Sequence, residues 1–228
     1  MAITRAQLSS LSELASWMQA NAVPNIFKSV TFANDTLTAT DDDDNTVLKI
    51  NNATNGYFRA YRTSTSYISI ENVDQFPRGG ATIDIIGCEN GFIVNSMYGV
   101  EGTYSWTSYK IAFLVTKTNN GKLAVIFNSV ENSASNLLYS GIKHVAFGDS
   151  TTLASTTTFT PESGNQTNFC TFCTNADITD VSYTPKAFYL HMHSAYNSGI
   201  GKFLSGGKVY ITNGYWAIDT EQTEEDAT

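Results

Sequence analysis

The chain has 228 residues, of which only 15% are charged, and its formal net charge is −8. The length allows one large domain or two small ones with a sizeable core. The acidic balance argues against nucleic acid as a partner, because phosphate binding needs an excess of lysine and arginine. No segment has the roughly 20 apolar residues that insert as a membrane-spanning helix.

Residues 4–20 have the pattern of an amphipathic helix. Thr4 and Gln7 fit an N-terminal capping box, and Pro24 follows the end of the pattern. Hydrophobic residues recur at helical spacing on one face, opposite a polar face. They are Leu8, Leu11, Leu14, Ala15 and Met18. This stripe packs either on the rest of the chain or on another subunit, and we predict that residues 1–24 form a docking or assembly element.

From residue 25 onward, polar and apolar residues alternate with the period of two that is typical of β-strands. The segment SVTFANDTLTAT predicts two strands around a turn at Asn34 and Asp35. Residues 119–121 (Asn-Asn-Gly) and 212–214 (Thr-Asn-Gly) predict two further hairpins, because Asn and Gly tolerate positive φ. The glycine-rich residues 199–208, GIGKFLSGGK, lack the order of a phosphate-binding loop and predict a plain loop before the last hairpin.

About a dozen short strands separated by turn signals predict a mainly β fold. We expect an antiparallel β-sandwich or jelly-roll-like body over residues 25–220, with the helix at its N-terminal side. A loop-rich break near residues 131–141 leaves open a division into two sub-domains. The acidic residues 221–228 are expected to form a disordered tail.

The acidic run from Asp41 to Asn45 favours a solvated β-turn. A calcium loop of the EF-hand type needs Gly at its sixth position and Glu at its twelfth, where this chain has Thr46 and Asn52. A looser calcium site remains an alternative.

Cysteine and histidine gather in residues 168–193. Cys170 and Cys173 have the spacing of a zinc knuckle, but in a strand their side chains point to opposite faces. His191 and His193 share one face of a strand, which would hold a metal only if symmetry brought several copies together. We therefore predict no metal or other cofactor. Cys88, in an apolar segment, is expected to be buried.

Aromatic residues cluster in a Gly/Ser/Thr-rich segment over residues 98–109. They are Tyr98, Tyr104, Trp106 and Tyr109. Such rings suit glycan recognition, a subunit interface or internal packing, and the sequence leaves the three alternatives open. Signatures of hydrolases, zinc proteases and P-loop enzymes are absent, so we predict a protein that is not an enzyme.

Both ends of the chain resemble small structural proteins encoded by phages and prophages of gut Firmicutes. The N-terminal likeness lies in ITRAQLSSLSELASWM and VPNIFKSVTFANDTLTATDDDD, and the C-terminal one in GKFLSGGKVYITNGYWAID. The last element is similar to a hairpin motif of virion proteins. Its residues here are Gly207, Tyr210, Gly214, Ala217 and Ile218.

The resemblance implies a virion component, such as a fibre, baseplate or head-decoration protein, made in the bacterial cytoplasm and located in the particle. We expect its partners to be other virion proteins and copies of itself, with host attachment through a surface glycan as a further role. We expect no nucleic acid partner and no membrane insertion. The alternative function is a carbohydrate-binding module that uses the aromatic 98–109 loop.

Overall fold

The computed structural model describes residues 2–61, 64–65, 67–100, 109–117, 123–131, 142–146, 157–159, 170–171, 187–189, 200–213, 216–223 and 225. Within these ranges the chain forms one helix and 17 strands in two antiparallel sheets. The prediction of a mainly β, antiparallel, sandwich-like body with a helix near the N-terminus is confirmed.

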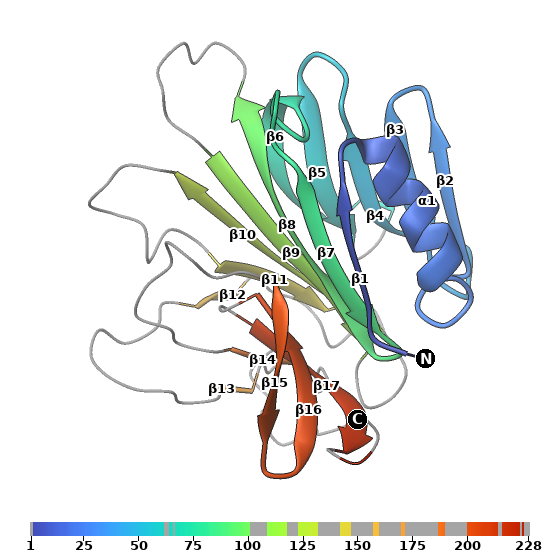
Figure 1. Cartoon of the computed structure of the whole chain (residues 1–228). Coiled ribbons are helices and arrows are strands. Elements are labelled where there is room, and N and C mark those ends of the chain that lie inside the picture. Colours follow the sequence, from blue (N-terminus) through green and yellow to red (C-terminus); the bar gives the residue numbers. More distant parts are fainter. Residues whose placement is uncertain are drawn as a thin grey trace.

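The first sheet has 12 strands and curls into a half-barrel (Figure 1). Its main path runs β12 (Thr157–Phe159), β11 (Ile142–Ala146), β10 (Leu123–Glu131), β9 (Tyr109–Lys117), β8 (Gly91–Val100), β6 (Tyr67–Gln75), β5 (Gly56–Tyr61), β4 (Thr46–Asn51), β3 (Thr36–Thr40), β2 (Ser29–Ala33). A branch at β8 adds β7 (Ile83–Cys88) and then β1 (Thr4–Leu8). The second sheet has five strands, in the order β13 (Cys170–Thr171), β14 (Ala187–Tyr189), β17 (Trp216–Thr223), β16 (Lys208–Thr212), β15 (Gly201–Ser205).

The helix α1 (Leu11–Asn21) begins later than predicted. Ser10 is its N-cap, and the Ser10 hydroxyl accepts a hydrogen bond from the Glu13 backbone N–H at 3.2 Å. The Glu13 carboxylate in turn accepts the backbone N–H of Ser9 at 2.7 Å. This hydrogen bond lowers the pKa of Glu13. The predicted cap at Thr4 is therefore wrong, because Thr4 begins a strand that pairs with β7.

The apolar stripe of the helix is directed into the chain's own core. Leu11, Leu14, Ala15 and Met18 are each at most 2% exposed, and Leu8 packs against the same core cluster from β1. In Figure 1, α1 lies inside the curl of the sheet between β1 and β2. The predicted docking of this stripe on another subunit is wrong for the folded chain, because the half-barrel already covers it.

Alternation along the strands separates the two faces of the curled sheet. One row of paired residues crosses β2 to β6 on the inner face: Phe32, Leu37, Ile50, Phe58, Ile70. The next row lies on the outer face: Thr31, Thr38, Lys49, Arg59, Ser69. The inner row is apolar because, apart from Phe32 at the open edge, it faces the core, whereas the outer row is polar because it faces solvent.

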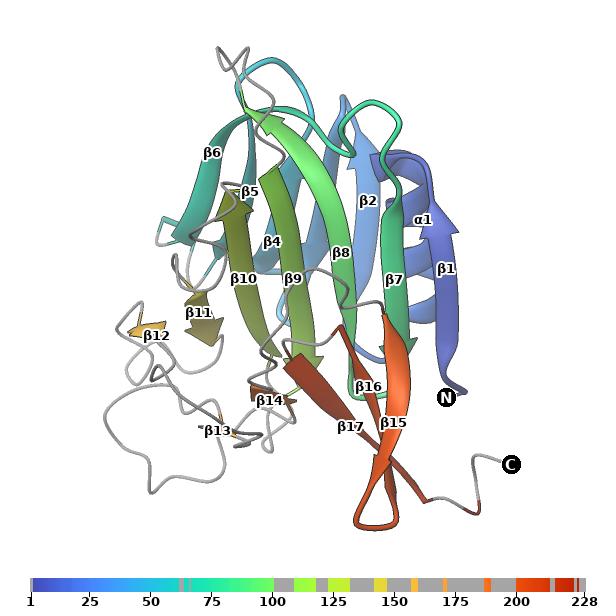
Figure 2. The ribbon, with the colours of Figure 1, turned by 60° about the vertical axis from the view of Figure 1, so that its left-hand side comes forward.

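The second sheet covers the outer face of β7, β8 and β9. Apolar residues from both sheets meet there in a second core cluster: Ile86, Cys88, Ile93, Ala112, Leu114, Ile200, Ile211, Ile218. Figure 2 shows β15–β17 crossing the lower end of these strands. Two amide side chains add hydrogen bonds across this contact, from Asn90 Nδ2 to the Asp219 carbonyl at 2.8 Å and from Asn213 Nδ2 to Asn95 Oδ1 at 3.0 Å. The predicted burial of Cys88 is confirmed, because it is 1% exposed.

The edge strand β2 is held by the helix as well as by β3. Gln19 Nε2, on α1, donates a hydrogen bond to the Val30 backbone carbonyl at 2.9 Å. Val30 is buried, but Phe32, two residues further along the edge, is 37% exposed. The contact thus satisfies one of the carbonyls that an edge strand leaves without a neighbouring strand.

The C-terminal part differs from the prediction in two places. Residues 201–205, expected in a loop, form β15 and pair with β16. Strand β17 continues to Thr223, so residues 221–223 of the predicted disordered tail belong to a strand. Strands β10 and β11, on either side of the break near 131–141, are neighbours in one sheet.

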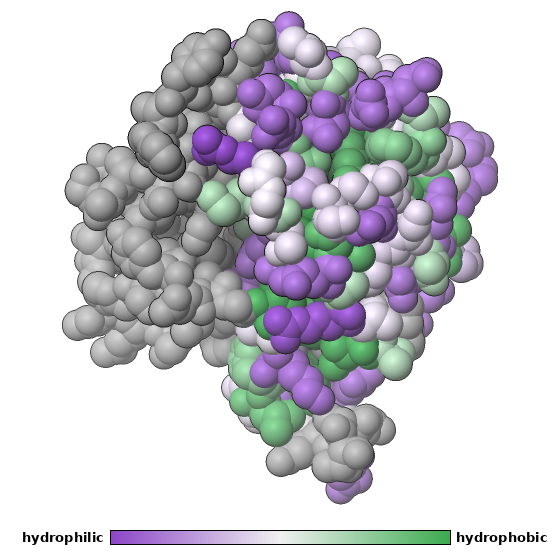
Figure 3. Space-filling view, turned by 45° about the horizontal axis from the view of Figure 1, so that its top comes forward, coloured by the Kyte–Doolittle hydropathy of each residue, from purple (hydrophilic) through white to green (hydrophobic). Residues whose placement is uncertain are grey.

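The described surface is mixed in character. Hydrophilic residues cover much of the face seen in Figure 3, with smaller hydrophobic patches between them. Among the described residues no helix has the length and apolar character needed to cross a membrane.

Candidate functional site

A cluster of aromatic and charged side chains occupies the outer face of β5 and β6. The guanidinium carbon of Arg59 lies 3.8 Å from the centre of the Tyr57 ring and 4.7 Å from the centre of the Tyr67 ring. Arg59 also donates from Nε and Nη2 to the two carboxylate oxygens of Glu71, at 2.8 and 3.1 Å. We call these four residues the β5–β6 cluster.

Alternation and register bring the cluster together. Tyr57 and Arg59 are two residues apart on β5 and therefore share a face. Glu71 is the cross-strand partner of Tyr57, and Tyr67 is the partner of Tyr61. The Tyr61 ring lies 5.2 Å from that of Tyr67. The cluster is thus built from direct and diagonal neighbours on two paired strands.

The charges in the cluster stabilise each other. Hydrogen bonding to Glu71 raises the pKa of Arg59, so the guanidinium stays protonated. Burial alone would raise the pKa of Glu71, but hydrogen bonds from Arg59 and Ser69 outweigh it and lower the pKa. Burial raises the pKa of Tyr57 above its ordinary value of 10.0, so its hydroxyl is uncharged at neutral pH, as that of any unperturbed tyrosine is. The cluster therefore presents a neutralised ion pair between two uncharged rings.

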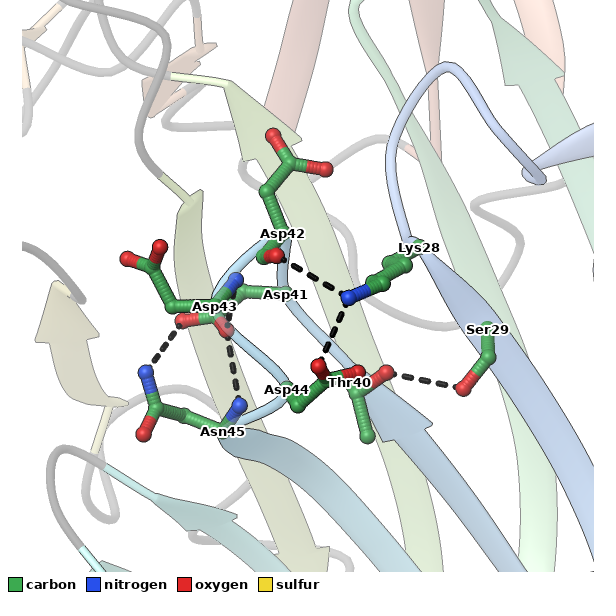
Figure 4. Close-up of polar contacts among 8 residues, drawn as sticks. All are labelled: Lys28, Ser29, Thr40, Asp41, Asp42, Asp43, Asp44 and Asn45. Atoms are coloured by element: carbon green, nitrogen blue, oxygen red, sulfur yellow. Dashed lines mark hydrogen bonds and ion pairs between the residues drawn. The ribbon is translucent and has the colours of Figure 1, made fainter.

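The acidic run forms the turn between β3 and β4, as predicted (Figure 4). Asp41 Oδ1 accepts the backbone N–H groups of Asp43 and Asn45 at 3.0 and 2.8 Å. Lys28 Nζ lies 2.6 Å from Asp44 Oδ2, and this contact raises the pKa of Lys28. These carboxylates serve to close the turn and to bind a lysine. In the described part of the chain no three His, Cys, Asp or Glu residues are grouped as a metal site would require.

The four aromatic residues predicted around the 98–109 segment do not all face solvent. Tyr98 is 4% exposed, and its ring packs on Phe58 at 6.4 Å in the core. The prediction of Tyr98 as a ligand-binding ring is therefore wrong, and internal packing is the alternative that applies to it. Tyr109 begins β9 and is the cross-strand partner of Tyr98, whereas Tyr104 and Trp106 lie outside the described residues.

The cysteine and histidine segment is described only in part. Cys170 lies in β13, which pairs with β14, as the strand interpretation requires. Cys173, His191 and His193 lie outside the described residues. That this segment binds no metal, unless symmetry brings copies of His191 and His193 together, stays a prediction.

Sequence reasoning missed the β5–β6 cluster. The signal that was available is the alternation in YFRAY and YISIE, which places Tyr57 with Arg59 and Tyr67 with Glu71 on one face of each strand. The partnering of the two strands depends on their register, which the sequence does not show.

Comparisons with known proteins found no relative: no protein-family model, no curated protein and no solved structure matches the chain.

Proposed function

We propose that this chain is a non-enzymatic structural component of a phage particle, such as a fibre, baseplate or head-decoration protein, and that it assembles with copies of itself. The resemblance of its two ends to virion proteins motivates the proposal. The observation that carries it is the use of the C-terminal motif in a projecting hairpin. Gly207 has a φ of 75° in the turn between β15 and β16, and Ala217 and Ile218, on the next strand of the same sheet, are both buried.

Assembly through α1 is not part of this proposal, because the apolar face of the helix is buried. The hairpin of β15 and β16 extends beyond the rest of the body in Figures 1 and 2. Near its tip, Leu204 is 53% exposed, and β15 forms one edge of its sheet. The unpaired backbone groups of this edge strand, with Leu204 beside them, offer a surface on which the same hairpin of a second copy can pair.

The mass in solution tests the proposed assembly. We expect the full chain to form an oligomer by light scattering, and Leu204→Glu to reduce that mass. Lys202→Glu, two residues earlier on the same exposed strand, is the matched control and should leave the mass unchanged. A wild-type monomer at all concentrations, or an unchanged mass for Leu204→Glu, contradicts assembly through the hairpin.

Membership of a particle needs a separate measurement. Phage particles induced and purified from the culture that encodes this chain should contain it when their proteins are identified by mass spectrometry. Particles that lack the chain would show that the proposed structural role is wrong, whatever the oligomeric state.

A further inference from the structure

The β5–β6 cluster has no part in the assembly proposed above, yet it lies within reach of solvent. Tyr67 is 42% exposed, and the side chains of Arg59 and Glu71 are 24% and 39% exposed. In both ribbon views β5 and β6 lie at the opposite end of the body from the C-terminal sheet (Figures 1 and 2). We propose that this face binds a neutral polysaccharide, with Tyr57, Arg59, Tyr67 and Glu71 as its contact residues.

The position of the tyrosines separates this cluster from an ordinary solvent-facing sheet. The same outer face carries only small or aliphatic polar residues on β2 to β4: Thr31, Thr38, Lys49, Thr36, Asn51. Among the described residues of β5 and β6, large rings gather around Arg59: Tyr57, Tyr61 and Tyr67. An exposed ion pair and an exposed cation–π contact each stabilise a fold weakly. The Tyr67 ring packs on the buried Tyr61 ring, with 5.2 Å between ring centres, but its remaining 42% exposure leaves a face that internal packing does not use.

The chemistry of the four side chains matches that of a sugar. The face of a tyrosine ring offers an apolar surface against which the C–H groups of a pyranose ring can pack and leave water. Beside the rings, the Glu71 carboxylate accepts hydrogen bonds and the Arg59 guanidinium carries five N–H donors, of which Glu71 takes two, while Tyr61 also hydrogen-bonds to Arg59. Sugar hydroxyls both donate and accept, so they pair with each group.

The charge of the molecule favours a neutral ligand over an anionic one. Arg59 is already paired with Glu71, so it offers no net positive charge to a phosphate or carboxylate. The chain as a whole carries a net charge of −8 and repels polyanions at a distance.

The shape of the site favours a polymer over a small sugar. Sites for small molecules are concave and enclose most of the ligand, whereas this cluster lies on the outer face of a sheet. A chain of sugars gains contacts along that face, where Lys49 on β4 is the cross-strand partner of Arg59 and Asn51 is that of Tyr57. This inference goes beyond the proposed structural role and does not depend on it.

Affinity electrophoresis of the full chain tests the proposal. Native gels are prepared with single soluble neutral polysaccharides: a β-glucan, an α-glucan, a galactan, a mannan and a rhamnose-rich cell-wall polysaccharide. We expect at least one of them to retard the wild type, and Tyr67→Ala to weaken that retardation at least fivefold. Tyr67→Phe keeps the ring and should bind like the wild type, and so should the control Thr38→Ala on the same outer face.

Two results would overturn the proposal: no retardation by any of the five neutral polymers, even if a polyanion such as polygalacturonate retards the chain, or equal retardation of wild type and Tyr67→Ala. Circular dichroism checks the fold of each variant. If Tyr67→Ala does not fold, Glu71→Gln decides in its place, because it removes the charged acceptor at nearly constant shape. Unchanged binding by that variant would then exclude the cluster.

Discussion

The outer faces of β2–β6 and β7–β9 belong to the same curled sheet, yet they have opposite character. On β2–β6 the outer rows contain Thr, Lys, Arg and Ser beside three tyrosines, which are Tyr57, Tyr61 and Tyr67. On β7–β9 the outer row contains Ile86, Ile93 and Leu114, which are cross-strand partners. The inner faces of both regions share one core cluster. The difference shows that the polarity of an outer face depends on what covers it.

The same difference is visible along single strands. In β3, TLTAT alternates between half-buried threonines and fully buried apolar residues. In β9, residues 111–115 are apolar without interruption, and all five are buried. A strand that is covered on both faces has no solvent-facing positions, so it loses the alternation.

Among the changes considered, removal of residues 1–22 should reduce the stability of the fold the most. The inner face of β2–β4 would lose Leu11, Leu14, Ala15 and Met18 from the core, and each larger side chain contributes about 1.5–3 kcal/mol on burial. We expect the truncated chain to lose its cooperative thermal transition in circular dichroism. A truncated chain that melts like the wild type would show that α1 is dispensable for the core.

Leu114→Ala should lower the free energy of unfolding by about 2–5 kcal/mol, because it leaves a cavity between the two sheets. Thr38→Ala, on the open outer face, should change it by no more than about 0.5 kcal/mol. Urea denaturation of both variants measures the contrast. Similar losses in the two variants would mean that the second sheet does not cover β9 in solution.

The labelling rate of the Cys88 thiol reports on the covered outer face of β7–β9 without a substitution in that face. Burial raises the pKa of Cys88 from 9.0 to about 11, so at pH 8 the thiolate is about a hundredfold scarcer than in the unfolded chain. In a Cys170→Ser/Cys173→Ser variant, iodoacetamide should label Cys88 at pH 8 at least that much more slowly in buffer than in urea. Equal labelling rates would contradict burial.

The same shift has a consequence for stability. Because the folded pKa of Cys88 is the higher one, the unfolded chain loses its proton first as the pH rises. The stability from this group is therefore complete below about pH 9 and decreases toward pH 11.

Glu71→Gln should have a small effect, because an exposed ion pair contributes about 0–1 kcal/mol. The folded pKa of Glu71 is lowered, so its contribution is present above its ordinary pKa of 4.5 and is lost as the pH falls below it. The difference in urea midpoint between wild type and variant should therefore be larger at pH 7 than at pH 3. The reverse order would mean that Arg59 does not stabilise this carboxylate.

Local patterns predicted the strands more reliably than the contacts between them. The turn at Asn34 and Asp35 was predicted from residue type, and both residues have positive φ, 49° and 56°. The start of α1 was misplaced because Thr4 and Gln7 mimic a capping box, whereas Ser10 and Glu13 provide the actual cap.

Contacts between distant segments could not be read from spacing. The helical stripe showed that a partner was needed but not which one, and the partner proved to be the half-barrel itself. Ile86 and Ile218 meet in the second core cluster although 132 positions separate them (218 − 86). For the same reason the β5–β6 cluster was missed, because it requires the register of Tyr57 with Glu71.

The hydrogen bond from Gln19 to the Val30 carbonyl also bears on aggregation. Strand β2 is an edge, and an uncovered edge beside an exposed Phe32 offers a template for strands of other molecules. A side chain on the helix that occupies a backbone acceptor of this edge interrupts the template at one position. The helix therefore does more than fill the core: it occupies a backbone acceptor of an edge strand to which a neighbouring chain would otherwise pair.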